Sequence, residues 1–150
     1  MKKTLTSFVI AALTIATASC MHASDDVVIS VSDLPQTAQT TINKHFSGKK
    51  IAVAKKDKDL FDIDYEVIFT DADKIEFDSK GNWTDIECKN SSVPAALVPA
   101  EITSYVATNY PNAKIIELEK ERKKYDVKLN NGFELEFNTK FEVIKIELDD

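Results

Sequence analysis

The chain has 150 residues, of which 19 are basic and 25 are acidic, and its formal net charge is −6. A chain of this charge is a poor match for nucleic acid or for an anionic membrane surface, and we expect neither as a partner. Its 43% of hydrophobic residues is enough to build a core, so the composition is that of a folded globular protein.

The N-terminus predicts a secretory signal peptide over residues 1–23. Lys2 and Lys3 precede an uncharged, mostly apolar stretch, and small residues follow it, which is the order that export signals share. The stretch is shorter than the roughly 20 residues that span a bilayer, and we expect no transmembrane segment. Cleavage after Ala23 is favoured, with Ala18 as the alternative. The sequence therefore predicts a periplasmic or secreted protein.

Cys20 supports a second interpretation of the same segment. Residues 17–20 resemble a lipoprotein box, in which the cysteine carries the lipid, although Thr17 stands where an aliphatic residue is usual. A lipid anchor on Cys20 would change how the protein is attached and not how it folds. Removal of residues 1–23 takes away two basic residues and no acidic one, so the mature net charge becomes −8. Cys88 is then the only cysteine, and no internal disulfide can form.

An internal repeat organises the rest of the chain. Five pairs of similar residues lie 64 positions apart: Leu34 and Val98, Pro35 and Pro99, Ile42 and Val106, Phe46 and Tyr110, and Ile51 and Ile115. Further along, Tyr65-Glu66-Val67 and Tyr125-Asp126-Val127 lie 60 apart, as do Glu76-Phe77 and Glu136-Phe137. One four-residue difference near residues 55–59 reconciles the two offsets. We predict two units, over residues 32–88 and 97–150, joined by a short linker.

Each unit is expected to begin with a helix and to continue as four strands. Pro35 and Pro99 suit a first helical turn, and apolar residues then recur every four positions, as at Ile42 and Phe46. The clearest strands span residues 61–69 and 125–129, where apolar and polar residues alternate. Such alternation is typical of an antiparallel strand with one buried face. The sequence therefore predicts an α+β protein of two tandem helix-plus-four-stranded antiparallel units, in one continuous sheet with both helices on one face.

This pattern resembles the PepSY-like proteins, which are also described as putative beta-lactamase-inhibitor-like proteins and are common in Bacteroidetes. The resemblance covers residues 32–150 and rests on the Leu-Pro helix start, the aromatic helix end, the four-stranded meander and the second copy. It implies an inhibitor-like α+β fold and a periplasmic or secreted location. Inhibition of a beta-lactamase does not follow from it, because a shared fold does not carry a shared function.

The sequence offers little for catalysis or for metal binding. His45 is the one histidine after residue 23, and Cys88 is expected in the core, so no nucleophile–base pair is expected and we predict no enzyme and no cofactor. One histidine and one cysteine cannot form a structural zinc site. Asp57, Asp59 and Asp64 belong to a cluster of acids that could attract calcium, but the EF-hand spacing is missing. A solvated strand face explains these acids, and no metal ligands are predicted.

Strand alternation leaves one face of the sheet without a helix. We expect that face to bind a protein or peptide of the cell envelope, and restraint of an extracytoplasmic hydrolase is one form suggested by the family. The alternative is a small-molecule or calcium-binding envelope protein. The same alternation predicts that Ala52, Phe61, Ile146 and Leu148 lie under the helices. The residues expected to bind the partner are Trp83, Ile51, Val53, Ile68, Asp62, Asp64 and Glu66.

Overall fold

The computed structural model describes residues 26–59 and 61–149, and the expected signal peptide and Cys20 lie outside these ranges. Two short 3-10 turns precede the two α-helices, at Val31–Asp33 and Ala95–Leu97. No helix in the described part of the chain has the length and apolar character to cross a membrane. In chain order the elements are β1 (Val27–Ile29), α1 (Gln36–His45), β2 (Ile51–Lys58), β3 (Ile63–Phe69), β4 (Lys74–Phe77), β5 (Trp83–Glu87), α2 (Ala100–Asn109), β6 (Ile115–Lys120), β7 (Lys124–Leu129), β8 (Phe133–Asn138) and β9 (Val143–Leu148).

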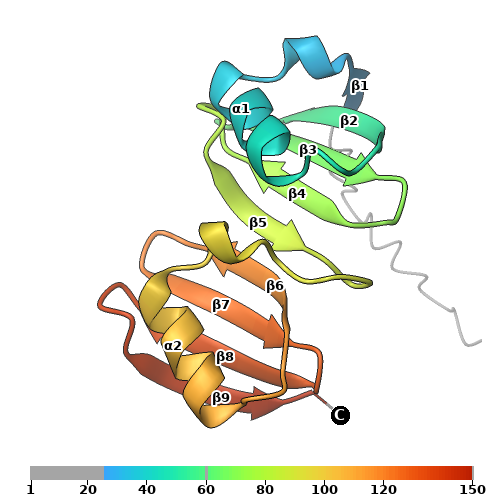
Figure 1. Ribbon diagram of the computed structural model, residues 1–150. Coiled ribbons are helices and arrows are strands. Elements are labelled where there is room, and N and C mark those ends of the chain that lie inside the picture. Colours follow the sequence, from blue (N-terminus) through green and yellow to red (C-terminus); the bar gives the residue numbers. More distant parts are fainter. Residues whose placement is uncertain (1–25, 60, 150) are drawn as a thin grey trace, which may run out of the picture.

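All nine of these strands belong to one antiparallel sheet, in the order of the sequence. Each strand therefore pairs with the next one along the chain, and β5 pairs with β6 where the two halves of the molecule meet (Figure 1). The predicted α+β class with an antiparallel sheet is confirmed. The sheet has nine strands where eight were expected, because β1 has only three residues and is too short to show an alternating pattern.

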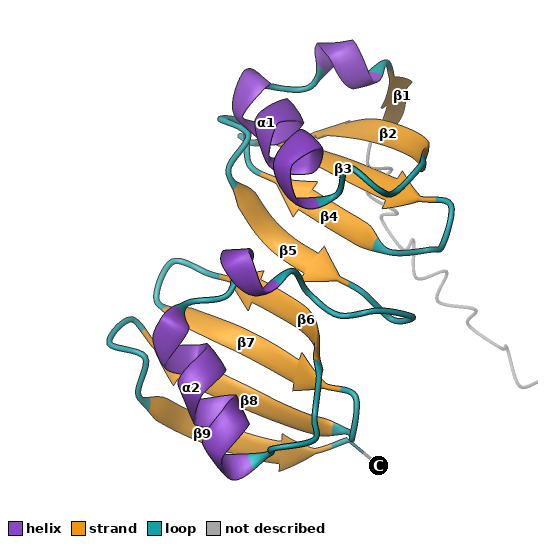
Figure 2. Ribbon diagram, in the orientation of Figure 1, coloured by secondary structure: helices purple, strands orange, loops and turns teal. Residues whose placement is uncertain are grey.

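Aromatic contacts fix the position of the two helices. Phe46, which directly follows α1, stacks on Phe69 of β3 with ring centroids 5.2 Å apart. Tyr105 of α2 meets Phe137 of β8 edge-on at 5.5 Å. Phe69 and Phe137 both belong to the buried side of the sheet, so α1 and α2 lie over the same side (Figure 2). The opposite side of the sheet carries no helix, and we call it the open face.

The buried side of the sheet forms a continuous apolar row that crosses both halves. The residues of this row are paired strand by strand: Ala54, Val67, Ile75, Ile86, Leu118, Val127 and Leu135. All of them are buried, in one cluster with Ile42 of α1 and Val106 of α2. The two helices and both halves of the sheet thus share one hydrophobic core, as burial of their apolar stripes requires.

The two halves repeat the same local geometry. Each α-helix has ten residues, and they begin 64 positions apart, after Pro35 and Pro99. The pairing of β4 with β5 contains a bulge beside Phe77, and the pairing of β8 with β9 contains one beside Phe137. Gly81 occupies the left-handed region with φ of 83°, and a Cβ there would lie 2.7 Å from the Cβ of Pro35, so α1 packs closely on this turn.

Two β-bulges place side chains on the opposite side of the sheet from the one that strict alternation predicted. In β2, Ile51 is opposite Phe69 while Val53 is opposite Ile68, so Ala52 is an extra residue. Ile51 therefore faces the core, and Ala52 is exposed, where the sequence predicted the reverse. These assignments were wrong because one extra residue shifts every side chain before it to the other face.

The second bulge changes the assignment of Trp83. Phe77 pairs with Trp83 and Glu76 pairs with Asp85, which leaves Thr84 as the extra residue. Trp83 therefore lies on the helix side with Phe77 and packs against the core. Its predicted position on the open face was wrong, and the bulge follows the turn at Gly81, where a glycine permits such a bend.

Three further residues expected under the helices are exposed. Phe61 is 95% exposed because β3 begins only at Ile63, and Phe61 belongs to the turn before it. Ile146 and Leu148 are 48% and 56% exposed. Their side chains point to the helix side as predicted, since Ile146 pairs with the buried Leu135. They are exposed because β9 is the last strand, and no strand of the described chain pairs with its outer edge.

Candidate functional site

Six carboxylates stand side by side across the open face. They occupy paired positions on six consecutive strands, from β3 to β8, and we call them the acidic row: Glu66, Glu76, Asp85, Glu119, Asp126 and Glu136. Lys55 of β2 and Lys145 of β9 end the row on its two sides. Neighbouring strands lie about 4.8 Å apart, so the row is about 24 Å long.

The rest of the open face is also rich in carboxylates. A second row runs beside the first, with two apolar residues at one end: Val53, Ile68, Lys74, Glu87, Glu117, Lys128, Glu134 and Glu147. The pairing also brings Asp57, Asp64 and Lys124 to this face. With both rows the face carries twelve carboxylates and five lysines, so it holds a clear excess of negative charge.

Like charges face each other at the seam, the junction between β5 and β6. Asp85 is opposite Glu119, and Glu87 is opposite Glu117. Burial first, and then the neighbouring carboxylates, raise the pKa of Asp85 to about 6. Burial also raises the pKa of Glu117 and of Glu119. Ionisation of these three carboxyls is therefore disfavoured, whereas the hydrogen bond from Lys89 lowers the pKa of Glu87, the fourth carboxyl of the seam.

Two lysines supply cations near the seam: Lys89, with its Nζ 2.7 Å from Glu87, and Lys74. The Nζ of Lys74 lies 2.9 Å from Glu76, 3.6 Å from Asp85 and 3.7 Å from Glu87. Burial opposes the charge of this ammonium, but the three carboxylates outweigh that effect and raise its pKa. The seam therefore holds an ammonium group among carboxylates, although the side chain of Asp85 keeps one buried oxygen without a hydrogen bond.

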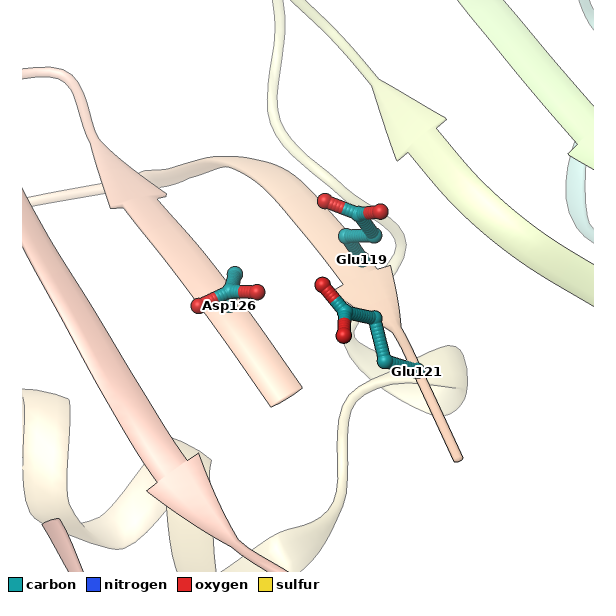
Figure 3. A group of neighbouring side chains, drawn as sticks. All are labelled: Glu119, Glu121 and Asp126. Atoms are coloured by element: carbon teal, nitrogen blue, oxygen red, sulfur yellow. The ribbon is translucent and has the colours of Figure 1, made fainter. Parts of the chain in front are cut away.

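A second acidic group lies next to the seam, at the end of β6. One carboxylate oxygen each from Glu119, Glu121 and Asp126 lie within 4.8 Å of one another. Figure 3 shows Glu119 and Glu121 extending from β6 and the segment after it, beside Asp126 on β7. Lys124 approaches the same group, with its Nζ 2.8 Å from Asp126 and 3.2 Å from Glu121. As at the seam, an ammonium group sits among the carboxylates.

The structure divides the predicted partner-binding residues between two faces. Val53, Ile68, Asp64 and Glu66 lie on the open face, whereas Ile51 and Trp83 pack on the helix side. Asp62 lies outside β3, in an exposed position of the preceding turn.

Of the acidic row, sequence reasoning named only Glu66 as a binding residue. Glu76 and Glu119 alternate with apolar residues along their strands, and this alternation was the signal that their side chains face solvent. Their alignment depends on the pairing of all strands, which no single strand reveals. The sequence did assign Cys88 correctly: it is buried and free, and burial raises the pKa of its thiol to about 11. Such a thiol is a poor nucleophile at neutral pH.

Comparison with known proteins identifies the family of this chain and solved structures with a similar fold. The family model described as "Putative beta-lactamase-inhibitor-like, PepSY-like" matches residues 63–145. The chain belongs to this PepSY-like family. Comparison with curated proteins gives no match.

Three solved structures from Bacteroides resemble this PepSY-like chain over nearly their whole length. A putative periplasmic protein from Bacteroides vulgatus is 54% identical, with a TM-score of 0.81 over 83% of this chain and 98% of that one. A protein from Bacteroides thetaiotaomicron, described as a putative calcium-regulated periplasmic protein, is 50% identical, with a TM-score of 0.81 over 82% and 97%. A second Bacteroides vulgatus protein, of unknown function, is 41% identical, with a TM-score of 0.77 over 81% and 98%.

Proposed function

We propose that the protein is a non-enzymatic binding protein of the cell envelope, which holds a basic segment of another protein against its open face. The acidic row is the observation that carries this proposal. The periplasmic descriptions of the relatives and the signal-like N-terminus support export to the envelope. Restraint of an extracytoplasmic hydrolase is one form that such binding could take, as the family description suggests.

The geometry of the acidic row suits an extended cationic chain better than a compact ligand. An extended peptide advances about 3.3 Å per residue, so the row matches about seven residues of such a chain. Lys74 and Lys124 each contact several carboxylates, so this face already accommodates ammonium groups. Lysines of a partner would occupy equivalent positions between the other carboxylates of the row. Val53 and Ile68 add an apolar end to the same surface.

The proposal also gives the tandem organisation a role. We propose that residues 32–88 and 97–150 are two copies of one unit. A single unit would carry half of the acidic row, and pairing of β5 with β6 makes the row continuous. The duplication thus doubles the length of chain that the face can bind.

Calorimetric titration with deca-lysine tests this proposal. The exported chain should bind the peptide, and the affinity should fall steeply between about 50 and 500 mM salt, because the Debye length shrinks from about 14 to about 4 Å. The double variant Asp85→Asn/Glu119→Gln should lose at least tenfold in affinity. The control Asp33→Asn/Glu101→Gln removes the same charge from two exposed positions outside the sheet, in the turn before α1 and in α2, and should bind as the native chain does. Equal losses in the two variants would refute a role for the acidic row.

Calcium is a second candidate ligand, favoured by one group of side chains. The carboxylates of Glu119, Glu121 and Asp126 are close enough to share one ion, and calcium takes oxygen ligands. The description of the Bacteroides thetaiotaomicron relative as calcium-regulated supports the same ligand for this chain. Calcium would compete there with Lys124, whose ammonium group contacts two of the three carboxylates.

Calcium titration with variants separates this candidate from the first one. Glu121→Gln should weaken calcium binding, and Lys124→Met should strengthen it by removing the competing ammonium group. Glu142→Gln is the control, since Glu142 is an exposed acid outside the group. Calcium affinities that are the same in all three variants would exclude a site at Glu119, Glu121 and Asp126.

A further inference from the structure

The last strand of the sheet exposes apolar side chains that its counterpart buries. Ile146 and Leu148 of β9 are 48% and 56% exposed, while the residues 60 positions earlier, Ile86 and Cys88, are fully buried. Ile86 is covered because β6 lies beside β5 and places Leu118 opposite it. Among the described residues β8 pairs with one edge of β9, and no strand pairs with its other edge.

An uncovered edge of this kind is ready to accept another strand. β9 has six residues, contains no proline, and carries the exposed side chains Ile144, Ile146 and Leu148. The other edge of the sheet, β1, has only three residues. Long apolar edges pair with further strands unless they are blocked by charge, proline, a bulge or a covering segment. The bulge in β9 lies at the start of the strand, where Ile144 is the extra residue, so residues 145–148 form the regular part of this edge. Lys145 and Glu147 are the charged residues on β9, and both point to the open face with exposures above one half.

We propose that β9 pairs antiparallel with β9 of a second copy of this chain, around a two-fold axis at Ile146. This register puts Ile146 opposite its own copy and Leu148 next to the partner's bulge residue Ile144, so the apolar side chains cover one another. It also puts Lys145 opposite the partner's Glu147, and Glu147 opposite the partner's Lys145. Opposite charges at paired positions stabilise a sheet, so the strand is complementary to itself.

Charge selects this register over its two neighbours. A shift by one pair in one direction puts Lys145 opposite its own copy, and a shift in the other direction puts Glu147 opposite its own copy. Both shifted registers bring like charges together and are disfavoured. In the proposed register the two sheets become one, and the acidic rows of both copies lie on the same face of it.

Sedimentation equilibrium on the exported chain tests the pairing. A single strand pair makes a small interface, so the mean mass should rise from monomer to dimer between about 1 and 100 µM. Ile146→Lys should raise the dissociation constant at least tenfold without lowering the melting temperature, because the side chain is already half exposed. Val27→Lys is the control, since Val27 lies on the opposite edge with an exposure of 56%, and it should dimerise normally.

Complementary charge variants test the register itself. Lys145→Glu makes positions 145 and 147 both acidic, and Glu147→Lys makes both basic, so each variant alone should be monomeric. An equimolar mixture of the two should dimerise again, because every pair across the axis then joins opposite charges. The proposal is overturned if the native chain stays monomeric at 100 µM, if Ile146→Lys dimerises as the native chain does, or if the mixture remains monomeric.

Discussion

Asp85 on β5 and Glu119 on β6 lie directly opposite each other at the seam that joins the two halves of the sheet. Two carboxylates at paired positions repel when both are ionised, and burial adds to the cost of charging them. The pKa of Asp85 accordingly rises to about 6, with burial as the main cause. The Asp85 carboxyl therefore takes up a proton more readily in the folded state than in the unfolded chain.

Asp85→Asn should change how stability depends on pH. A carboxyl whose pKa is raised on folding destabilises the folded state once it ionises, so native stability falls as the pH rises from about 4 to about 6. The variant lacks this loss and should be more stable than the native chain by about 1–3 kcal/mol at pH 7. At pH 4 the two should be nearly equal. Urea unfolding of both chains at four pH values measures the difference.

The control for this pH dependence is Glu101→Gln, because Glu101 is an exposed residue of α2. Its difference from the native chain should stay the same between pH 4 and pH 7. A constant difference for Asp85→Asn as well would show that the Asp85 carboxyl has an ordinary pKa in the folded protein.

The helices and the core were predictable, because both follow from spacing within one segment. Ile42 and Val106 repeat at helical spacing after a proline, and both are buried as expected. Phe77 and Phe137 alternate with acids, and both are buried too. These features need no knowledge of which strand lies beside which.

The facing of Trp83 and the acidic row were not predictable, because both depend on pairing between strands. Alternation alone places Trp83 on the open face, and the extra residue Thr84 reverses it. Asp85 and Glu119 are 34 positions apart in the sequence, and only the pairing of β5 with β6 brings them together. The acids were read as a solvated strand face, and their alignment into one row appears only with the complete sheet.

Ala72 and Gly132 provide a matched pair of backbone tests. They lie 60 positions apart, and both occupy the left-handed region, with φ of 68° and 88°. Ala72→Gly should stabilise the protein by about 0.5–1 kcal/mol, because glycine avoids the Cβ strain. Gly132→Ala should cost about 1 kcal/mol, and this cost is conformational, because the new Cβ would meet its nearest atom at an ordinary 3.4 Å. Thermal unfolding that moves in the same direction for both variants would contradict this assignment.

Asp73 is a fully buried carboxylate that depends on its ion pair with Lys49. Its side chain also accepts a 2.6 Å hydrogen bond from the Ser91 hydroxyl. Lys49→Met would leave this charge buried without its ammonium partner and should cost about 3–5 kcal/mol in denaturant unfolding. Asp71→Ala is the comparison, since Asp71 binds the same lysine but is 43% exposed. It should cost less than about 1 kcal/mol, and equal costs would show that burial does not set the difference.

Trp83→Ala should destabilise the fold. The ring packs against the core on the helix side, with the Nζ of Lys120 5.9 Å from its centroid. Truncation of a buried tryptophan costs about 3–5 kcal/mol, and partial exposure reduces the expected loss to about 2–3 kcal/mol. The same variant should bind deca-lysine as the native chain does, because Trp83 is not on the open face. An unchanged melting temperature together with weaker binding of deca-lysine would show that Trp83 belongs to the binding surface and not to the core.

The most direct test of the acidic row is an NMR titration of the exported chain with deca-lysine at about 50 mM salt, where screening is weak. We expect amide shift changes to concentrate on the six strands that carry the row, around Glu76, Asp85, Glu119 and Asp126, and to disappear at about 500 mM salt. Amides of α1 and α2 should not move. Shift changes centred on the helices, or none at low salt, would contradict the proposal that the open face binds a basic partner.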